Sequence, residues 1–517
     1  MKYKRKTLLL ILIATVVRFV IAYFTELGND EVYYRMYAQY LQWNYFDHPP
    51  IVGWLIRLTT FNLHLDNACF IRLGAIGAAA VTTWMMYLCG KRLNNEFTGF
   101  LAALIYTSSL YGSIIAGTFI LPDSPQMVCW AVGIYLLLGI VNGHQINNSK
   151  KRDLLIFGLV AGIGMLCKIH TVFLWLALLM YILLYNRQWL KQPVLYISPF
   201  ISLLLFYPVL KWNIDNHFVT YLYHSERVVV THSSIDFSSF LTFFSGQIFY
   251  YNPIIFFLIV ASTVGTFKNK FSILPAQKNI LLFSSIPLIC IAIGISFFKN
   301  VLPHWTGPAY SGLILLTAYA LSKATLKKIV STIRTPKILV AAIIFQMVVI
   351  VSGIFLINFM PGTFGNKEKN NLGEGDFTLD MYGWRNLKTA FKKIVTAEEE
   401  SGLIKKDAVI VCNKWFPASH IDYYVALPLH KDLIAIGDTS AIHQYVWINN
   451  ERKKLKPGDD AYCIVPSNNF VDVNSQYGHY FEFIQLSTII EQQRNGKPCR
   501  YFFIWRMKNY KATTWKY

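Results

Sequence analysis

Apolar residues in the first 358 positions come in long blocks that are separated by short polar stretches. Such blocks differ from the one-sided apolar stripe of a soluble helix. A bilayer core takes about 20 apolar helical residues to cross, so each block predicts a transmembrane helix. We expect eleven, near residues 7–25, 70–90, 97–115, 124–141, 153–168, 170–186, 193–210, 241–266, 279–298, 305–322 and 338–358. The pattern predicts a polytopic α-helical membrane protein.

The first block, "LLLILIATVVRFVIAYF", follows a basic start and therefore also resembles a secretory signal peptide. No small-residue cleavage site follows it, which favours a retained helix. The outer loop at 26–69 then carries two shorter patterns. Apolar residues recur at helical spacing from Tyr33 to Leu41, and Asn29 or Asp30 stands at the expected helix cap. "PPIVGWLIRL" begins the second pattern, so we expect two interfacial helices in this loop.

The charge distribution orients the predicted helices. The chain is 54% hydrophobic and 15% charged, with a formal net charge of +20. Such a charge could suit nucleic acid, but Lys and Arg concentrate in the N-terminal tail and in the loops on its side of the predicted membrane. The positive-inside rule explains this bias as topology. We therefore expect a cytoplasmic N-terminus and no nucleic-acid partner.

Acidic residues show the opposite distribution. Of the eleven Asp and Glu in residues 1–358, only Glu96 and Asp153 face inward. Membrane insertion places few demands on acids, so their clustering indicates a polar site at the outer leaflet. Asp30 and Asp123 each lie at the start of a predicted helix. A favourable position against the helix dipole explains either acid alone, and only the pair favours catalysis.

Residues 359–517 have a mixed composition that predicts a soluble α/β domain, whereas residues 1–358 form the transmembrane domain. A linker rich in Gly, Asn and charge begins at "MPGTFGNKEKNNLGEGD". The runs "AVIVCN" and "YCIVPS" predict strands, and "WRNLKTAFKKIVTAEEE" predicts a helix. Because the helix count is odd, this domain is expected on the outer side. The eight cysteines form no CxxC pair and are expected to be packing residues.

Basic groups at the predicted outer face offer partners for an anion. Lys168 lies in "LCKIHT", with His170 beside it, between two apolar blocks. Arg18 is placed inside the first helix, where a charged residue is by default a functional hypothesis. A snorkelling side chain is the alternative for Lys168. Arg227 follows in the outer loop "YLYHSERVVV".

Histidines add a second kind of chemistry to the outer loops. His224 could join Asp47 and His48 at one divalent ion, because carboxylate and imidazole suit zinc or a similar metal. His304 and Trp305 stand at the outer start of the tenth helix. The sequence has no GxxxxGK[ST] phosphate loop, no GxGxxG after a strand and no HExxH. Nucleotide-driven chemistry is therefore unsupported.

Taken in order, six of these motifs resemble a known family. They are "NDEVYY", "YFDHPP", "LPDSP", "LCKIHTVFL", "PVLKWN" and "LPHWTGPAY", which fall at corresponding topological places over residues 5–322. The chain resembles the membrane-embedded C-type glycosyltransferases (GT-C), specifically bacterial relatives of protein O-mannosyltransferases and of aminoarabinose transferases that modify lipid A. The resemblance implies a GT-C fold in a bacterial inner membrane, with the C-terminal domain periplasmic.

The resemblance also implies an activity. Such enzymes transfer a sugar from a polyprenyl-phosphate donor to a glycan, lipid A or protein acceptor, with inversion. Their catalytic carboxylates match Asp30, its partner Glu31, and Asp123. The resemblance also implies one set of residues that binds the donor phosphate and a second set that binds the acceptor or the sugar. The first set comprises Lys168, Arg227, His48 and Arg18, and the second Tyr33, Tyr34, His304 and Trp305.

Two departures from the aminoarabinose transferases concern the metal and the phosphate. Those transferases have glutamate and lysine where this chain has Asp47 and His48, and arginine in place of Tyr33. Asp47 and His224 are the implied ligands of a divalent metal (Zn, Mg or Mn), although protein O-mannosyltransferases need none. The charge at His48 depends on pH. The alternatives are an ion-coupled transporter of an envelope precursor, which usually has midplane acids and repeated halves, and a non-enzymatic scaffold.

Overall fold

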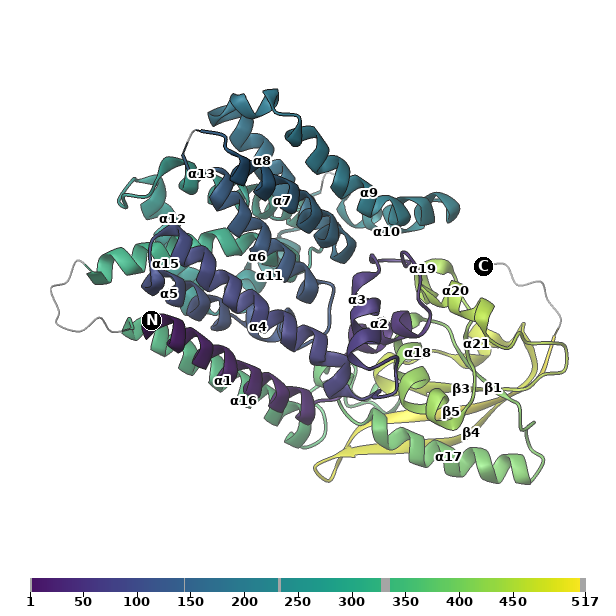
Figure 1. Ribbon diagram of the computed structural model, residues 1–517. Helices are drawn as coiled ribbons and strands as arrows, with labels where there is room; N and C mark the ends of the chain where they lie inside the picture. The colour runs from purple at the N-terminus through teal and green to yellow at the C-terminus, as the bar shows by residue number, and fades with distance from the viewer. Residues whose placement is uncertain (1, 144, 231–233, 327–334, 512–517) are drawn as a thin grey trace. The chain divides into compact units, whose positions relative to one another are not determined.

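Most of the predicted apolar blocks are helices in the computed structural model, which describes residues 2–143, 145–230, 234–326 and 335–511 (Figure 1). The chain forms two compact units. Unit 1 contains the residues up to Ala22 together with Leu41–Ile350. Unit 2 contains Tyr23–Tyr40 together with the residues from Val351 onward. The segment that carries Asp30 therefore belongs to the same unit as the C-terminal domain.

Unit 1 is helical. Its helices are α1 (Lys2–Phe24, which runs on into unit 2), α3 (Ile51–Thr59), α4 (Ala68–Leu93), α5 (Glu96–Thr107), α6 (Asp123–Ile140), α7 (Asn148–Cys167), α8 (Val172–Tyr185), α9 (Val194–Asp215), α10 (Val219–Val228), α11 (Phe237–Tyr250), α12 (Pro253–Phe267), α13 (Pro275–Phe283), α14 (Ile286–Ser296), α15 (Tyr310–Leu326) and α16 (Lys337–Phe359, which also runs on into unit 2). Among the described helices, six runs are long and apolar enough to cross a membrane, or seven if the bent pair α11 and α12 counts as one.

Two predicted helices are wrong because each contains a break. The helix expected over 241–266 is α11 followed by α12, which bend by 98°. Asn252 has a φ of 63° at the break, and Pro253 cannot donate a backbone hydrogen bond. The helix expected over 97–115 ends at Thr107, and a separate π-helical turn, η1 (Tyr111–Ile115), follows it.

Small residues let the helices of unit 1 approach closely. A Cβ added at Gly90 of α4 would lie 2.8 Å from the Cα of Gly99 in α5. Between α7 and α9, the hydroxyl of Ser202 donates to the carbonyl oxygen of Gly158 over 2.5 Å. Close backbone approach at small residues and hydroxyl bonds between helices are the usual means of helix association in apolar surroundings.

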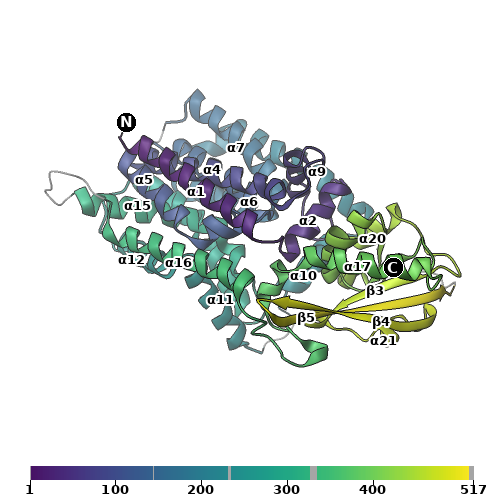
Figure 2. The ribbon, with the colours of Figure 1, turned by 90° about the horizontal axis from the view of Figure 1, so that it is seen from below.

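Unit 2 contains α2 (Asn29–Gln39), α17 (Trp384–Glu400) and a five-stranded sheet in the order β2-β1-β3-β5-β4. Strands β1 (Val409–Cys412), β2 (Leu433–Ala435) and β3 (Ala461–Pro466) are parallel, and β5 (Lys497–Tyr510) runs antiparallel to both β3 and β4 (Phe481–Arg494). Figure 2 shows β4 and β5 as a long yellow hairpin. The α17 helix has the predicted bounds, β1 lies within its predicted run, and β3 begins one residue before its run.

Sequence patterns did not predict the β4–β5 hairpin, and they did not predict that residues 360–376, the expected linker, are folded. Asn495 and Gly496 both have positive φ and make the tight turn between β4 and β5. The expected linker is fixed against the hairpin, because Asp376 at its end forms a fully buried ion pair of 2.9 Å with Arg494. This segment is therefore part of the folded unit.

Candidate functional site

The central pair of the site in unit 1 is Asp123 and Lys168. Asp123 is the first residue of α6, just after Pro122, and Lys168 is the residue at which α7 ends, in extended backbone. The ammonium of Lys168 lies 2.8 Å from a carboxylate oxygen of Asp123. The side chains are only 6% and 2% exposed, respectively. A charge so deeply buried needs its partner, so the two side chains act as a unit.

Tyr111 holds Asp123 from a second side. Its hydroxyl donates to the other carboxylate oxygen over 3.1 Å. The Tyr111 ring lies directly against Gly307, where an added Cβ would lie 1.9 Å from the ring carbon Cζ. The hydroxyl of Tyr251 donates to the carbonyl oxygen of Gly307 over 2.9 Å and fixes that backbone. Glycine is therefore required for the tyrosine to reach the carboxylate.

Several histidines surround this ion pair. The rings of His48 and His224 are 5.9 Å apart, and those of His170 and Trp305 are 6.0 Å apart. Burial lowers the pKa of His48 well below its usual range, and the nearby His224 and Lys168 lower it further. At neutral pH this imidazole is therefore an uncharged hydrogen-bond donor.

His304 in the 3₁₀ segment η4 (Pro303–Ala309) belongs to the same group. Burial, followed by the charge of Lys168, lowers the pKa of His304 to about 4, while Asp123 opposes the shift. Lys168 acts electrostatically on both His48 and His304, so these three side chains lie near one another although they come from three distant parts of the chain. The result is a cluster of imidazoles and one ammonium around a single carboxylate.

Asp47 and His224 do meet, but through the backbone. The Nε2–H of His224 donates to the carbonyl oxygen of Asp47 over 2.7 Å. That nitrogen is consequently occupied and cannot bind a metal in this arrangement. In the described parts of the chain, no three His, Cys, Asp or Glu side chains gather so as to hold a metal ion. The residues present do not fit the metal centre suggested for Asp47 and His224, and no catalytic step is assigned to one.

The two arginines predicted to bind phosphate have different surroundings. Arg227 of α10 is exposed, and its guanidinium lies 4.7 Å from the ring centre of Tyr223. Arg18 of α1 is buried and donates to the carbonyl oxygens of Gly112 (3.2 Å) and Ser113 (3.4 Å) in η1. Those contacts give Arg18 a structural task, because a π-helical turn leaves carbonyl groups to be satisfied.

In unit 2, Asp30 and Glu31 differ sharply in exposure. Asp30 lies in the first turn of α2 and is exposed. Glu31 is 2% exposed, and its carboxylate accepts the backbone N–H of Gly28 over 2.9 Å. The helix cap is Gly28, so the expected cap at Asn29 or Asp30 is wrong. The carboxylate of Glu31 stabilises the start of the helix that presents Asp30.

Tyr33 and Tyr34, predicted to bind acceptor or sugar, are both buried in unit 2. The hydroxyl of Tyr33 accepts the backbone N–H of Gln444 over 3.1 Å, and its ring lies 5.0 Å from that of Trp415. The Tyr34 ring lies 5.8 Å from the Tyr33 ring. These contacts fix α2 within the unit.

Sequence reasoning missed Tyr111 and did not assign His170 to the site. Tyr111 lies within an apolar block, where nothing local distinguishes a tyrosine that will reach Asp123. His170 had one signal, namely its place two residues after Lys168 at a helix junction. Gln126 also went unnoticed, and its amide donates to Thr171 Oγ1 over 3.1 Å, tying α6 to that junction.

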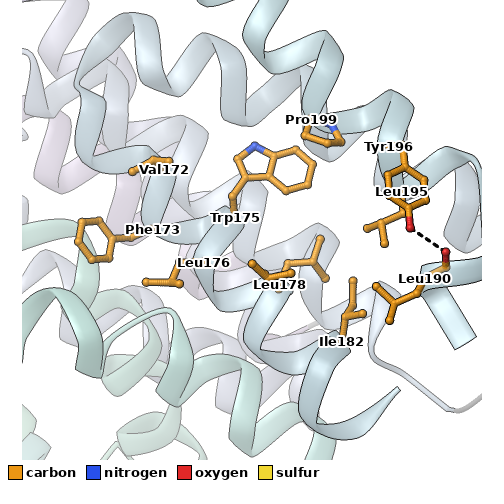
Figure 3. A pocket seen from close by; sticks show the side chains of 11 residues that line it. Val172, Phe173, Trp175, Leu176, Leu178, Ile182, Leu190, Leu195, Tyr196 and Pro199 are labelled. Carbon is orange, nitrogen blue, oxygen red and sulfur yellow. Dashed lines mark hydrogen bonds between the residues drawn. The ribbon is translucent and has the colours of Figure 1, made fainter. Parts of the chain in front are cut away.

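A hollow in unit 1 is lined almost entirely by apolar side chains. It has a volume of about 590 Å³ and is lined by α8, the 3₁₀ segment Arg187–Lys191 and the first residues of α9. Figure 3 shows its lining, in which the hydroxyl of Tyr196 donates to the carbonyl oxygen of Leu190. The remaining lining groups are aliphatic or aromatic, and they extend from Val172 at the start of α8 to Pro199. Such a hollow can accept hydrocarbon.

Known proteins share parts of this sequence and its fold. Residues 47–212 match the dolichyl-phosphate-mannose-protein mannosyltransferase family. The lipid A galacturonosyltransferase RgtD of Rhizobium johnstonii is 23% identical over 321 residues, which span 61% of this chain and 66% of that protein.

The fold is similar to that of ArnT from Cupriavidus metallidurans. The apo crystal structure superposes with a TM-score of 0.64 at 13% identity and covers 98% of both chains. The ArnT structure bound to undecaprenyl phosphate superposes with a TM-score of 0.58 at 14% identity, over 96% of this chain and 97% of that one.

Proposed function

We propose that this chain is a membrane glycosyltransferase of the C type and moves a sugar from a polyprenyl-phosphate donor to an envelope acceptor. Its motifs and the similarities described above support this proposal. The observation that carries the proposal is the buried Asp123–Lys168 pair with imidazoles around it. An ammonium and neutral imidazole N–H groups are suitable donors for a phosphate. The name of the ArnT complex, with undecaprenyl phosphate, supports a lipid phosphate as the anion.

The proposed topology places this chemistry at the outer face of a bacterial inner membrane. Eleven membrane crossings with a cytoplasmic N-terminus would put Asp30, Asp123 and Lys168 on that face, with the C-terminal domain in the periplasm. The name of RgtD supports lipid A as the acceptor, and that of the matched family supports protein. The acceptor group is a hydroxyl or a phosphate in either case.

In the proposed reaction, the carboxylate of Asp30 takes the proton of the acceptor hydroxyl. The electron pair freed on the acceptor oxygen forms a bond to the anomeric carbon, and the bond between that carbon and the phosphate oxygen breaks. The lipid phosphate leaves with the bonding pair, and the sugar is inverted. A positioned base accounts for about 10²–10⁴ in rate. Lys168 and Arg227 would stabilise the charge that grows on the leaving phosphate.

The apolar hollow along α8 fits the lipid part of such a donor. Its lining begins at Val172, four residues after Lys168 in the chain. A polyprenyl phosphate is an anion attached to a long hydrocarbon, so a cationic group followed by an apolar wall matches both of its parts. Transfer of apolar surface from water into such a hollow contributes about 25 cal/mol per Å².

The test compares envelope glycans of cells that make the chain with those of cells that do not. Mass spectrometry of lipid A, glycoproteins and other envelope glycans should reveal an added sugar only when the chain is present. Asp30→Asn should abolish that addition while the protein remains folded. Asp66→Asn, another acid of the same outer loop, is the matched control and should keep the activity. Normal transfer by the Asp30→Asn variant would refute the proposed mechanism.

A further inference from the structure

The short segment Glu26–Asn29, which ends at the first residue of α2, is held by the C-terminal part of unit 2. The carboxylate of Glu26 accepts the backbone N–H groups of Trp384 (2.8 Å) and Arg385 (3.3 Å). These are the first two residues of α17, whose N–H groups have no partner within the helix. Gly383 precedes them and has no side chain to supply a cap. Glu26 therefore caps a helix that lies 358 residues later in the sequence.

The next contacts of this segment involve two side chains from the region of α18 (Trp415–Ile421) and the turn after it. The backbone N–H of Leu27 donates to the hydroxyl of Tyr424 over 2.9 Å. Nε2 of His420 lies 2.9 Å from Oδ1 of Asn29. An amide oxygen only accepts, so Nε2 of His420 carries the hydrogen. Both contacts fix backbone or side-chain groups immediately before Asp30.

His420 is itself rigidly placed. Its ring stacks on the indole of Trp384, with centroids 4.3 Å apart and planes 19° apart, and lies nearly parallel to the ring of Tyr424. Burial lowers the pKa of His420 well below its usual range, so the ring is neutral at physiological pH. The amide of Asn29 also hydrogen-bonds to Asp380, which gives Asn29 partners on two sides.

We propose that the C-terminal domain positions the catalytic helix α2 through the segment Glu26–Asn29, with His420 and Asn29 as the positioning residues of Asp30. The inference rests on the proposed role of Asp30 as the base. Asp30 follows Asn29 directly, so the bond to His420 sets the position of its backbone. A misplacement of about 1 Å at a reacting group can cost about 10²-fold in rate. The domain is thus part of the catalytic apparatus in addition to any contact with the acceptor.

His420→Phe in the full-length protein tests this inference, because phenylalanine keeps the ring stack and removes the N–H donor. Hydrogen–deuterium exchange followed by mass spectrometry should show about tenfold faster exchange in peptides that cover residues 26–40. Sugar transfer should fall about tenfold or more, while affinity for undecaprenyl phosphate should not change. His420→Gln, whose amide can donate to Asn29, should restore much of the transfer.

The matched control is His479→Phe, at an exposed histidine of the same domain. This variant should leave both exchange and transfer as in the wild type. Unchanged exchange of residues 26–40 in His420→Phe, or unchanged transfer, would overturn the inference. Failure of the proposed function is distinguishable, because the wild type would then transfer no sugar while the exchange experiment would still report whether His420 holds α2.

Discussion

Opposite substitutions at the Asp123–Lys168 pair should change phosphate binding in opposite directions. Lys168→Met removes the cation and leaves the carboxylate, whereas Asp123→Asn removes the carboxylate and leaves the cation. At an effective dielectric constant of 20, a phosphate charge about 4–6 Å from a carboxylate is repelled by about 3–4 kcal/mol. Even a third of that energy changes affinity about tenfold. We expect Lys168→Met to weaken undecaprenyl phosphate binding at least tenfold, and Asp123→Asn to strengthen it by a similar factor.

Stability provides the second half of the prediction. The side chains are 6% and 2% exposed, so each single variant leaves an uncompensated buried charge that costs about 3–5 kcal/mol. The double variant removes both charges and should lose less than the sum of the two. Thermal unfolding with and without undecaprenyl phosphate, together with a direct binding assay, measures both effects. A result in which both single variants weaken phosphate binding equally would refute the assignment of Lys168 as the phosphate cation.

Three further outcomes are expected. Gly307→Ala places a methyl group within the ring of Tyr111, so thermal stability and sugar transfer should both fall, and unchanged values of both would contradict the close contact. Burial lowers the pKa of His304 to about 4. Below about pH 6.5 the unfolded chain therefore binds more protons than the folded protein, and stability is lost as pH falls toward 4. Between pH 7.5 and pH 5, the melting temperature of His304→Gln should fall less than that of the wild type. Arg494→Met should cost about 3–5 kcal/mol by leaving Asp376 buried without its partner, and a melting temperature close to that of the wild type would contradict this.

Local patterns predicted the features that depend on neighbouring residues. The length of the apolar blocks located most helices of unit 1, because the distance across a bilayer limits helix length. The amphipathic pattern from Trp384 to Glu400 predicted α17 with its observed bounds. The same approach failed at Asn252, although an Asn-Pro pair is a known helix breaker, because the apolar run continues on both sides.

The sequence alone determined the class of fold, the residue types available for chemistry and the family resemblance. Tertiary structure decided which of those residues meet. Lys168 and Asp123 are 45 positions apart, and His420 and Asn29 are 391 apart, so no local spacing could pair them. Tertiary structure also decided that Arg18 donates to a carbonyl group of η1 and that Nε2 of His224 hydrogen-bonds to a backbone oxygen. The physical reason is that burial forces each polar group to find a partner, and packing of distant segments determines which partner is within reach.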